Sequence, residues 1–542
     1  MAYGFKWRMG DYVGGQRAVH QAYKPWLALD PEEWAIGEFS IAPRDTTDRV
    51  FTGLGFEPDV LFLITPRVQL SNGLNDREFG ATGGGMAYGV AGRACPNIVQ
   101  FSGASRIRWA FEQKYSGWRE DCCLHVVSND AGTEVLRLVL VDFDPDGFTL
   151  EQSINLYDQS MYVAWLAMKG RFKTQIISAG DTQINGVPGS PTAAFFMSTQ
   201  HTLAHGPLRA GVWHHMQGFA TQSSQASIWG GGRDPNWDFT TEHWRDADSI
   251  TLALSALSSG YVGAELRVAG RITNWFDDEH SVTITRSGST ATVSDPGHGY
   301  GVGDCVYIAG ATQINYNGVV HVTGTTLNTW DYEVPGTPTT PATGTITATV
   351  GGVDLQYPTF DGNPYRVGCV LMGEPADSGV LETNWETRPG GTQNDPPGSG
   401  TNWVPTAVRP RVVLMQATNY FFSTNNLDPF DLPRLPNTFG FGGSGGLGWH
   451  AQPFTYGAGD SFGIHVFGNA VAERGRYANS GGQYMRGYIL AGQGANSNPP
   501  AYHQHSVDII PSPRYVGLNY RFGERHAQIK RFHRNESDVY VP

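Results

Sequence analysis

Hydrophobic and polar residues alternate with a period of two over many short stretches of this chain, which is the pattern of β-strands. Residues 134–153, "EVLRLVLVDFDPDGFTLEQS", are typical, because two such runs flank the turn sequence "DPDG". In that turn Pro145 pre-sets φ and Gly147 accepts a positive φ. Other runs, such as "VLFLIT" at 60–65, are apolar throughout. Few stretches have a helical period, so the pattern predicts an all-β protein.

The same hairpin presents three aspartates at alternate positions, Asp142, Asp144 and Asp146, as a calcium-binding EF-hand loop does. Such a loop needs a bidentate Glu at its twelfth position and a helix on each side. The twelfth residue here is Ser153, and the flanks have strand character. The sequence therefore favours a hairpin turn over a metal site, and we expect no bound metal or cofactor.

Three parts of the chain repeat one arrangement, in which an apolar strand is followed by a Gly-rich segment with small and aromatic residues. The opening strands lie in 55–66 ("GFEPDVLFLITP"), 172–183 ("FKTQIISAGDTQ") and 408–420 ("VRPRVVLMQATNY"). Closing strands with aromatic and small residues lie in 161–170, 365–374 and 484–494. This repetition predicts tandem β-sandwich domains.

The second repeat is interrupted at the place where the first has its "DPDG" turn. Its two halves are separated by about 70 residues, 281–352, with short alternating strands and turns at "SDPGHG", "GVGD" and "NYNG". Hairpin tips tolerate insertions, so this segment is predicted to be an inserted Ig-like β-sandwich. The predicted organisation is an N-terminal docking arm (1–50), sandwich one (51–170), sandwich two (171–375, interrupted by 281–352), a Gly/Pro-rich linker (376–404), sandwich three (405–495) and a locally basic tail (496–542).

Composition narrows the functional class. Aromatic residues make up 12% of the chain and charged residues 16%, with a net charge of −13, so a folded core is expected and nucleic-acid binding is not. The five cysteines are odd in number and lack a CxxC pair, which favours reduced, buried thiols. The N-terminus lacks a signal-peptide core, and no apolar run reaches 18 residues. We therefore expect no membrane span and assembly in a cytoplasm.

Residues 290–323, "TATVSDPGHGYGVGDCVYIAGATQINYNGVVHVT", followed by "WDYEVPGTPTTPATGTI", resemble a small β-sandwich module of tailed-bacteriophage virion proteins. The larger repeats are similar to a phage β-sandwich family with "GF-x-P-D-V-L" openings and "DGFTL" hairpins. The resemblance implies a structural or adhesive virion protein of the kind found in tail fibres and baseplates. Collagen-like tracts and heptads are missing, which favours a compact subunit over a fibre shaft. Virion symmetry implies a homo-oligomer that contacts other virion proteins.

Motifs for catalysis are weak. "GFGGSGG" at 440–446 fits both GxGxxG and GxSxG, but it lacks the preceding strand and following helix that either chemistry requires. The pairs His201/His205 and His214/His215 lie in apparent strand and loop sequence, so polar loop histidines are favoured over a metal site. Neighbouring acids such as Asp277 do not establish the two-carboxylate geometry of a glycosidase. We expect no enzymatic activity.

Aromatic side chains in Gly/Pro/Asp-rich segments are the better binding candidates, because such faces suit sugar or protein contacts. The alternative is that they plug the ends of the sandwiches. The candidates are Trp229, Trp237, Trp449, His450, Phe454 and Tyr456. Trp7, Trp26 and Trp34 lie before the first repeat, and a Trp-rich segment outside a core needs a partner that buries it. This is the basis for the predicted docking arm.

The most favoured function at this stage is a tail or baseplate component that contributes to host attachment through a surface glycan or protein. A capsid decoration or head-fibre protein is an alternative in the same class. A polysaccharide-degrading enzyme of a virion is the alternative in a different class, and it would require a convergent carboxylate pair in a cleft.

Overall fold

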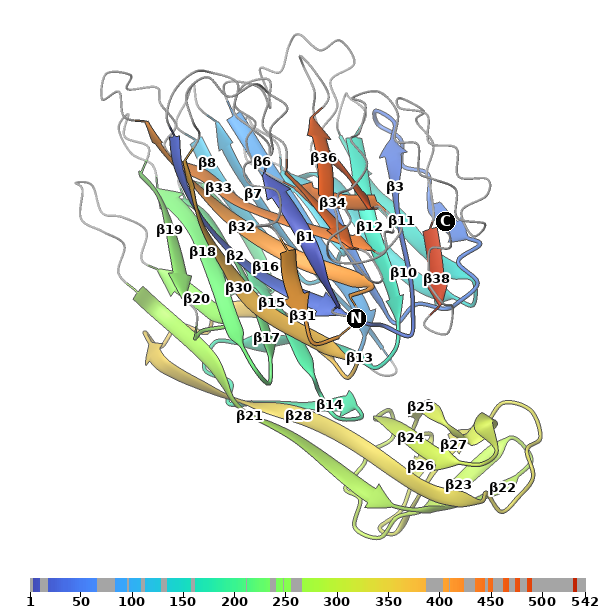
Figure 1. The fold of residues 1–542 in the computed structure, drawn as a ribbon. Coiled ribbons are helices and arrows are strands. Elements are labelled where there is room, and N and C mark those ends of the chain that lie inside the picture. The colour runs from blue at the N-terminus through green and yellow to red at the C-terminus, as the bar shows by residue number, and fades with distance from the viewer. Residues whose placement is uncertain are drawn as a thin grey trace.

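The computed structural model confirms an all-β protein built from antiparallel sheets (Figure 1). The residues that it describes are 3–9, 18–65, 83–94, 97–108, 113–127, 134–156, 161–210, 212–233, 240–246, 248–254, 266–386, 403–408, 410–423, 434–443, 447–451, 462–466, 473–477, 485–489 and 530–533. Within these ranges the helical structure is confined to one short 3₁₀ turn, Ile314–Tyr316.

Sandwich one consists of a long sheet and a shorter one that packs on its outer face. The long sheet has the strand order β16 (His205–Ala210), β8 (Gln113–Arg119), β7 (Ile98–Arg108), β6 (Gly83–Arg93), β5 (Val60–Thr65), β12 (Met161–Lys169), β3 (Glu33–Ile41) and β38 (Lys530–His533). The shorter sheet has the order β4 (Arg49–Thr52), β11 (Gly147–Asn155), β10 (Glu134–Asp144) and β9 (Leu124–Val127).

Sandwich two has the same plan, and its outer sheet continues into the insert. The inner sheet has the order β13 (Phe172–Ser178), β29 (Arg366–Met372), β15 (Ala193–Ser198), β17 (Val212–Thr221), β18 (Gln225–Arg233) and β19 (Thr240–Asp246). The outer sheet has the order β20 (Thr251–Leu254), β21 (Leu266–Ser281), β28 (Gly344–Phe360), β24 (Cys305–Ala311) and β25 (Gly318–His321), with β14 (Gln183–Pro188) also paired to β28.

The third large sheet has the order β30 (Ala376–Glu386), β2 (Ala18–Leu29), β32 (Val412–Ser423), β33 (Arg434–Gly443), β34 (Leu447–Ala451), β37 (Met485–Ile489) and β36 (Glu473–Tyr477). A small sheet has the order β31 (Trp403–Thr406), β1 (Tyr3–Met9) and β35 (Phe462–Val466), and its strand β35 contacts the third sheet. The insert adds a sheet with the order β22 (Thr283–Ser287), β23 (Thr290–Ser294), β27 (Thr329–Glu333) and β26 (Gly324–Thr325).

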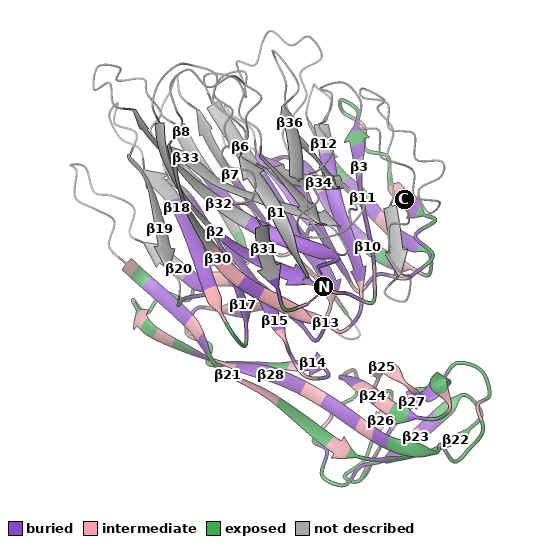
Figure 2. Cartoon of the chain, in the orientation of Figure 1, coloured by how far each residue is buried: buried purple, intermediate pink, exposed green. Residues whose placement is uncertain are grey.

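The three large sheets meet in one apolar cluster, here called the central core. It combines buried residues of β5, β12, β15, β29, β2 and β32, among them Phe62, Phe195 and Leu414. The described residues of β5, β12, β15 and β29 are buried at nearly every position, so these strands are covered on both faces (Figure 2, purple). In β5, Phe62 faces the central core whereas Leu61 faces the core of sandwich one. Because both faces of β5 are covered, every residue from 60 to 65 is buried. This explains why the run is apolar throughout and does not alternate between apolar and polar residues.

The inner sheets are related by an approximate threefold repetition of strand order. β12–β5–β6–β7 in sandwich one corresponds to β29–β15–β17–β18 in sandwich two and to β2–β32–β33–β34 in the third sheet. The backbone hydrogen bond at the end of each closing strand is also repeated. The three N–H···O bonds join Asp59 to Met168 (2.8 Å), Thr192 to Met372 (2.7 Å) and Arg411 to Leu29 (2.9 Å).

This correspondence corrects the sequence alignment of the repeats. The segment 172–183 forms β13, which occupies the place of β3, while β15 occupies the place of β5. In the third sheet the closing position belongs to β2 near the N-terminus, not to β37 in 484–494. The strand β2 pairs with β30 on one side and with β32 on the other.

The prediction of a docking arm at 1–50 is therefore wrong for the described part of that segment. Trp34 is fully buried and Trp26 is 5% exposed. Both lie in strands of large sheets, Trp26 in β2 and Trp34 in β3. The chain itself provides the partner that these tryptophans need, so no neighbouring subunit is required to cover them.

The insert has its own core and extends from sandwich two on the two long strands β21 and β28 (Figure 1). Its core includes Val293, Trp330 and Tyr332, all with essentially no exposure. The Arg171 guanidinium lies over the Tyr307 ring at 4.9 Å, which joins the body to the insert. Because Tyr307 belongs to β24 and Arg171 directly precedes β13, this contact braces the insert against sandwich two.

Candidate functional site

Trp229 is not an exposed loop residue, and this corrects its selection as a binding candidate. It lies in β18, is 2% exposed and belongs to the core of sandwich two. Its indole Nε1 donates to Gln200 Oε1 at 3.3 Å, and its ring lies 5.5 Å from the His214 ring. A tryptophan held in this way stabilises the sandwich and offers no surface to a ligand.

The remaining aromatic candidates are only partly placed. Trp449 and His450 lie in strand β34, where they pair with Phe441 and Gly440 of β33, so their assignment to a loop is wrong. Their backbone alone is described. Trp237, Phe454 and Tyr456 lie outside the described residues, and their role in binding stays a prediction.

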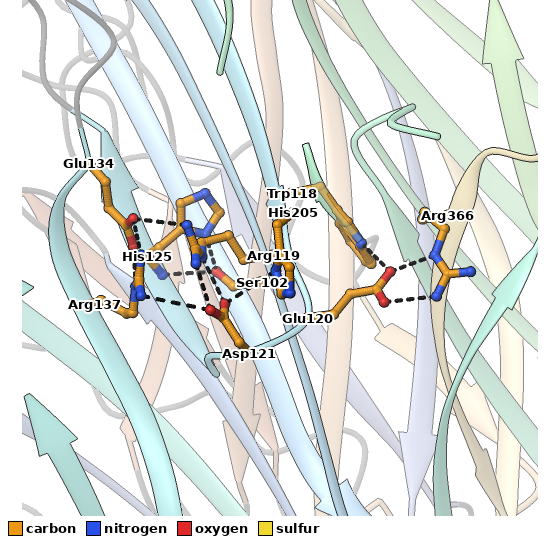
Figure 3. A network of polar contacts seen from close by, with 10 residues as sticks. All are labelled: Ser102, Trp118, Arg119, Glu120, Asp121, His125, Glu134, Arg137, His205 and Arg366. Carbon is orange, nitrogen blue, oxygen red and sulfur yellow. Dashed lines mark hydrogen bonds and ion pairs between the residues drawn. The ribbon is translucent and has the colours of Figure 1, made fainter. Parts of the chain in front are cut away.

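A network of charged side chains lies where sandwich one meets sandwich two (Figure 3). Glu120, which follows β8, binds Arg366 of β29 with two hydrogen bonds of 2.6 and 2.7 Å. The Trp118 indole donates to the same carboxylate at 2.9 Å. The Glu120 side chain is 10% exposed, so this bidentate pair is stronger than a surface ion pair. It fixes the two sandwiches relative to each other.

A second group of charged side chains centres on Asp121 (Figure 3). Together with Glu120 and Arg366 it is here called the seam network. Arg119 donates to both Asp121 oxygens at 2.7 and 2.6 Å and to Glu134 at 3.1 Å, and Arg137 also binds Glu134. The hydrogen bonds from Arg119 lower the pKa of Asp121 to about 2, against the opposing effect of burial. The imidazole of His205 lies 3.7 Å from Asp121. These side chains of opposite charge bind one another, so we interpret the group as structural.

Beside this group, His125 and Ser102 resemble a base and its nucleophile, since His125 Nδ1 lies 2.9 Å from Ser102 Oγ. The geometry does not fit nucleophilic catalysis. Ser102 is fully buried, donates to the Tyr88 carbonyl and accepts the His125 backbone N–H. Burial lowers the pKa of His125 to about 3, so the imidazole is neutral and poorly suited to take up a proton. The pair joins β9 of the shorter sheet to β7 of the long sheet.

The histidines that the sequence placed in polar loops are also interior. His201, His214 and His215 are 2%, 3% and 0% exposed, and the last two lie in β17. His214 and His215 pair with Gly231 and Gly230 of β18, so each bulky ring stands beside a residue without a side chain. The expectation of loop histidines holds for His201, although it is buried. It is wrong for His205, His214 and His215, which lie in strands, and of these His205 is 53% exposed at its side chain.

The hairpin with three aspartates is held as a turn. The Asp146 carboxylate accepts the backbone N–H groups of Gly53 and Gly55, and Asp144 accepts the Thr149 hydroxyl at 2.8 Å. These contacts tie the hairpin tip to the segment before β5. Among the described residues, no group of three or more His, Cys, Asp or Glu side chains has the geometry to hold a metal ion.

In the insert, His280 lies between two carboxylates. Its Nδ1 is 2.6 Å from Asp295 Oδ1 and its Nε2 is 3.0 Å from Asp278 Oδ1. The Asp295 side chain is 3% exposed and also accepts the Trp330 indole N–H at 3.1 Å. Burial opposes protonation of His280, but the hydrogen bonds and charges of the two aspartates outweigh it and raise its pKa. The group joins the end of β21 to the turn that follows β23.

The cysteines differ in state. Cys122, Cys123 and Cys369 are buried free thiols, as the sequence predicted. Cys305 in β24 is disulfide-bonded, so the prediction of reduced thiols is wrong at this position.

Comparisons with known proteins yield no relative. No protein-family model, no curated protein and no solved structure matches the chain. In the part of the chain that the structure describes, no helix is long and apolar enough to cross a membrane.

Proposed function

We propose that this chain is a structural protein of a tailed-bacteriophage virion, in the tail or baseplate, where it contributes to host attachment. The resemblance of residues 290–323 and of the three repeats to phage virion modules supports this role. A subunit that transmits force between a particle and a cell must be rigid and must present recognition surfaces away from its core.

The contacts of the described residues suit a scaffold. Three sheets share one central core, and the Glu120–Arg366 pair fixes sandwich one to sandwich two. The buried Arg411 side chain, 1% exposed, binds Asp30 at 2.9 Å beside the turn between β2 and β3. Such interactions resist relative motion of the sandwiches.

The observation that carries the proposal is the insert itself. A complete small β-sandwich extends from the body on two long strands, and the body does not need it for its own core (Figure 1). Large apolar side chains are exposed on it, with Val302 at 67%, Ile314 at 78% and Leu327 at 79%. Apolar side chains on an extended module are suited to contact with another macromolecule.

Electron microscopy of intact particles labelled with antibody against this chain tests the location. Label on the tail or baseplate is the expected result. Label over the head contradicts the attachment role and favours decoration of the capsid. Particles without label contradict the virion assignment as a whole.

Deletion of the insert tests the attachment role separately. Asp278 and Val350 are register partners in the β21–β28 ladder, so an Asn-Gly turn can replace residues 279–349 and close a hairpin. Phage that carry the shortened chain are expected to assemble but to adsorb more slowly to host cells. Unchanged adsorption by assembled particles contradicts a role of the insert in attachment.

A further inference from the structure

An aromatic and acidic surface lies at the end of β28 that is farther from the insert. Phe360 is the last residue of β28 and pairs with Val268, whereas the other end of the ladder joins Ser281 to Thr347 at the insert. Phe360 is 44% exposed, whereas its register partner Val268 is 2% exposed. Its ring lies 5.9 Å from the Tyr357 ring at an interplanar angle of 46°.

One side of the Phe360 ring rests on the turn between β13 and β14. Gly180 has φ of +102°, and a Cβ placed there would lie 2.9 Å from the Phe360 Cζ. A side chain at this position would push the phenyl ring away, so the glycine allows the outer edge of the ring to approach the turn closely. Tyr357 packs against a small cluster formed by Ala179, Val268 and Tyr365. The ring therefore contacts the turn and Tyr357, and 44% of the residue stays exposed to solvent.

Hydrogen-bonded carboxylates lie in the two turns next to this ring, Asp361 directly after Phe360 and Asp181 directly after Gly180. Asp361 accepts hydrogen bonds from the Asn363 backbone N–H at 3.0 Å, the Asn363 amide at 2.8 Å and the Tyr365 hydroxyl at 3.0 Å. Burial raises the pKa of Asp361, but these hydrogen bonds and the charge of Arg267 outweigh it and lower the pKa overall. The carboxylate therefore remains ionised and held in place. Asp181, beside Gly180, is anchored by the Ser178 backbone N–H at 2.8 Å.

This surface, here called the turn platform, consists of Phe360, Tyr357, Asp361, Asn363 and Asp181. A folding role accounts for its buried parts but not for a large aromatic ring left half open on a rigid turn. An aromatic face packs well against the C–H face of a pyranose ring, and carboxylate oxygens accept hydrogen bonds from sugar hydroxyls. Asp361 and Asp181 bring two formal negative charges against the one positive charge of Arg267, so the surface disfavours an anionic sugar.

We propose that the turn platform binds a neutral pyranose unit of a surface glycan. The inference rests on the proposed attachment function, because that role supplies the reason for a glycan contact. Phe360 provides the stacking face, and Asp361 and Asp181 accept hydroxyl donors from the bound sugar. The site lies apart from the insert, so the chain would contact a host surface at two places.

Saturation-transfer NMR with the full chain tests the site directly. The probes are neutral tetrasaccharides of glucose, galactose and N-acetylglucosamine, with tetragalacturonate as the anionic counterpart. We expect binding of at least one neutral probe and none of the anionic one. Failure of every neutral probe to bind, or equal binding of the anionic one, overturns the proposal.

Three variants locate the contact. Phe360→Ala is expected to weaken sugar binding about five- to tenfold, because the stacking face is lost. Phe360→Tyr keeps an aromatic face and should keep the affinity. Asp181→Asn should weaken sugar binding about twofold to fivefold, because a charged acceptor is lost. Val141→Ala, at an apolar side chain in β10 of sandwich one that is 53% exposed, is the matched control and leaves binding unchanged. Because Phe360 is half exposed, its replacement should not prevent folding, which a thermal melt verifies. Equal affinity of folded Phe360→Ala and wild-type protein overturns the assignment.

The outcome is distinguishable from failure of the proposed function. Tail label together with unchanged sugar binding in Phe360→Ala removes the turn platform alone. Absence of label from particles, together with sugar binding that depends on Phe360, removes the virion role and leaves a glycan-binding protein.

Discussion

Replacement of Leu27 by alanine tests whether the N-terminal strand is part of the central core. Leu27 is fully buried in β2 and stands opposite Leu414 of β32 and Ser378 of β30. Strands on both sides prevent the surroundings from collapsing into the space that the missing carbons leave. Leu→Ala changes in such cores cost about 2–5 kcal/mol, and we expect the upper half of this range.

The chain offers a matched comparison for this variant. Leu166 of β12 occupies the corresponding position in sandwich one, opposite Phe62, and is also fully buried. Leu166→Ala should therefore cost a similar amount, within about 1 kcal/mol of the Leu27→Ala value. Val50→Ala, at a side chain that is 64% exposed, should change stability by less than about 0.5 kcal/mol.

Urea unfolding followed by tryptophan fluorescence measures the three variants under the same conditions. The expected result is a lower midpoint for Leu27→Ala and Leu166→Ala, and an unchanged midpoint for Val50→Ala. If Leu166→Ala is destabilised while Leu27→Ala behaves like the exposed control, β2 does not belong to the core and the closure of the third sheet is refuted.

Three further outcomes follow from the polar groups. Arg366→Ala leaves the buried Glu120 carboxylate without its cation and should cost about 2 kcal/mol in urea unfolding; a change below about 0.5 kcal/mol contradicts its role in the seam. Burial lowers the pKa of His125 to about 3. The contribution of the neutral imidazole to the free energy of unfolding is therefore present above about pH 6.5 and is lost as the pH falls toward 3. Thermal melts of His125→Asn should show a weaker dependence on acid pH than those of the wild type. The pKa of His280 is raised, so its pH dependence has the opposite sign. The contribution of the protonated imidazole to the free energy of unfolding is complete below about pH 6.5 and is lost as the pH rises through the raised pKa. An NMR titration of the His280 imidazole should give a midpoint above that of a free histidine, and a midpoint at or below it contradicts the ion pair with Asp295.

The all-β class was predictable because alternation and turn residues are local signals. The position of β2 was not assigned, since its partners lie more than 300 residues away and Pro25 interrupts the run. The structure tolerates this proline because the β2–β32 ladder skips Lys24 and Pro25. A signal was nevertheless present: "WLAL" at 26–29 matches "WLAM" at 165–168, and both end at the repeated backbone bond.

The candidate sites were harder to predict, because exposure depends on tertiary packing. The Gly-rich sequence around Trp229 indicated a loop, but its glycines lie in β18 opposite the histidines of β17. The contact between Glu120 and Arg366 has no local sequence signal, because the two residues are 246 positions apart. The charged run "WRED" at 118–121, in a chain poor in charge, was the available signal for one half of it.

Closure of the body by its N-terminal strand is the claim on which the rigid scaffold depends. Hydrogen–deuterium exchange of the intact chain, read by mass spectrometry on peptides that cover β2, β5 and β15, tests it most directly. The backbone amides of residues 26–29 should be protected to the same degree as those of β5 and β15. Exchange of 26–29 at the rate of an unfolded peptide, while β5 and β15 remain protected, would show a free arm and contradict the account.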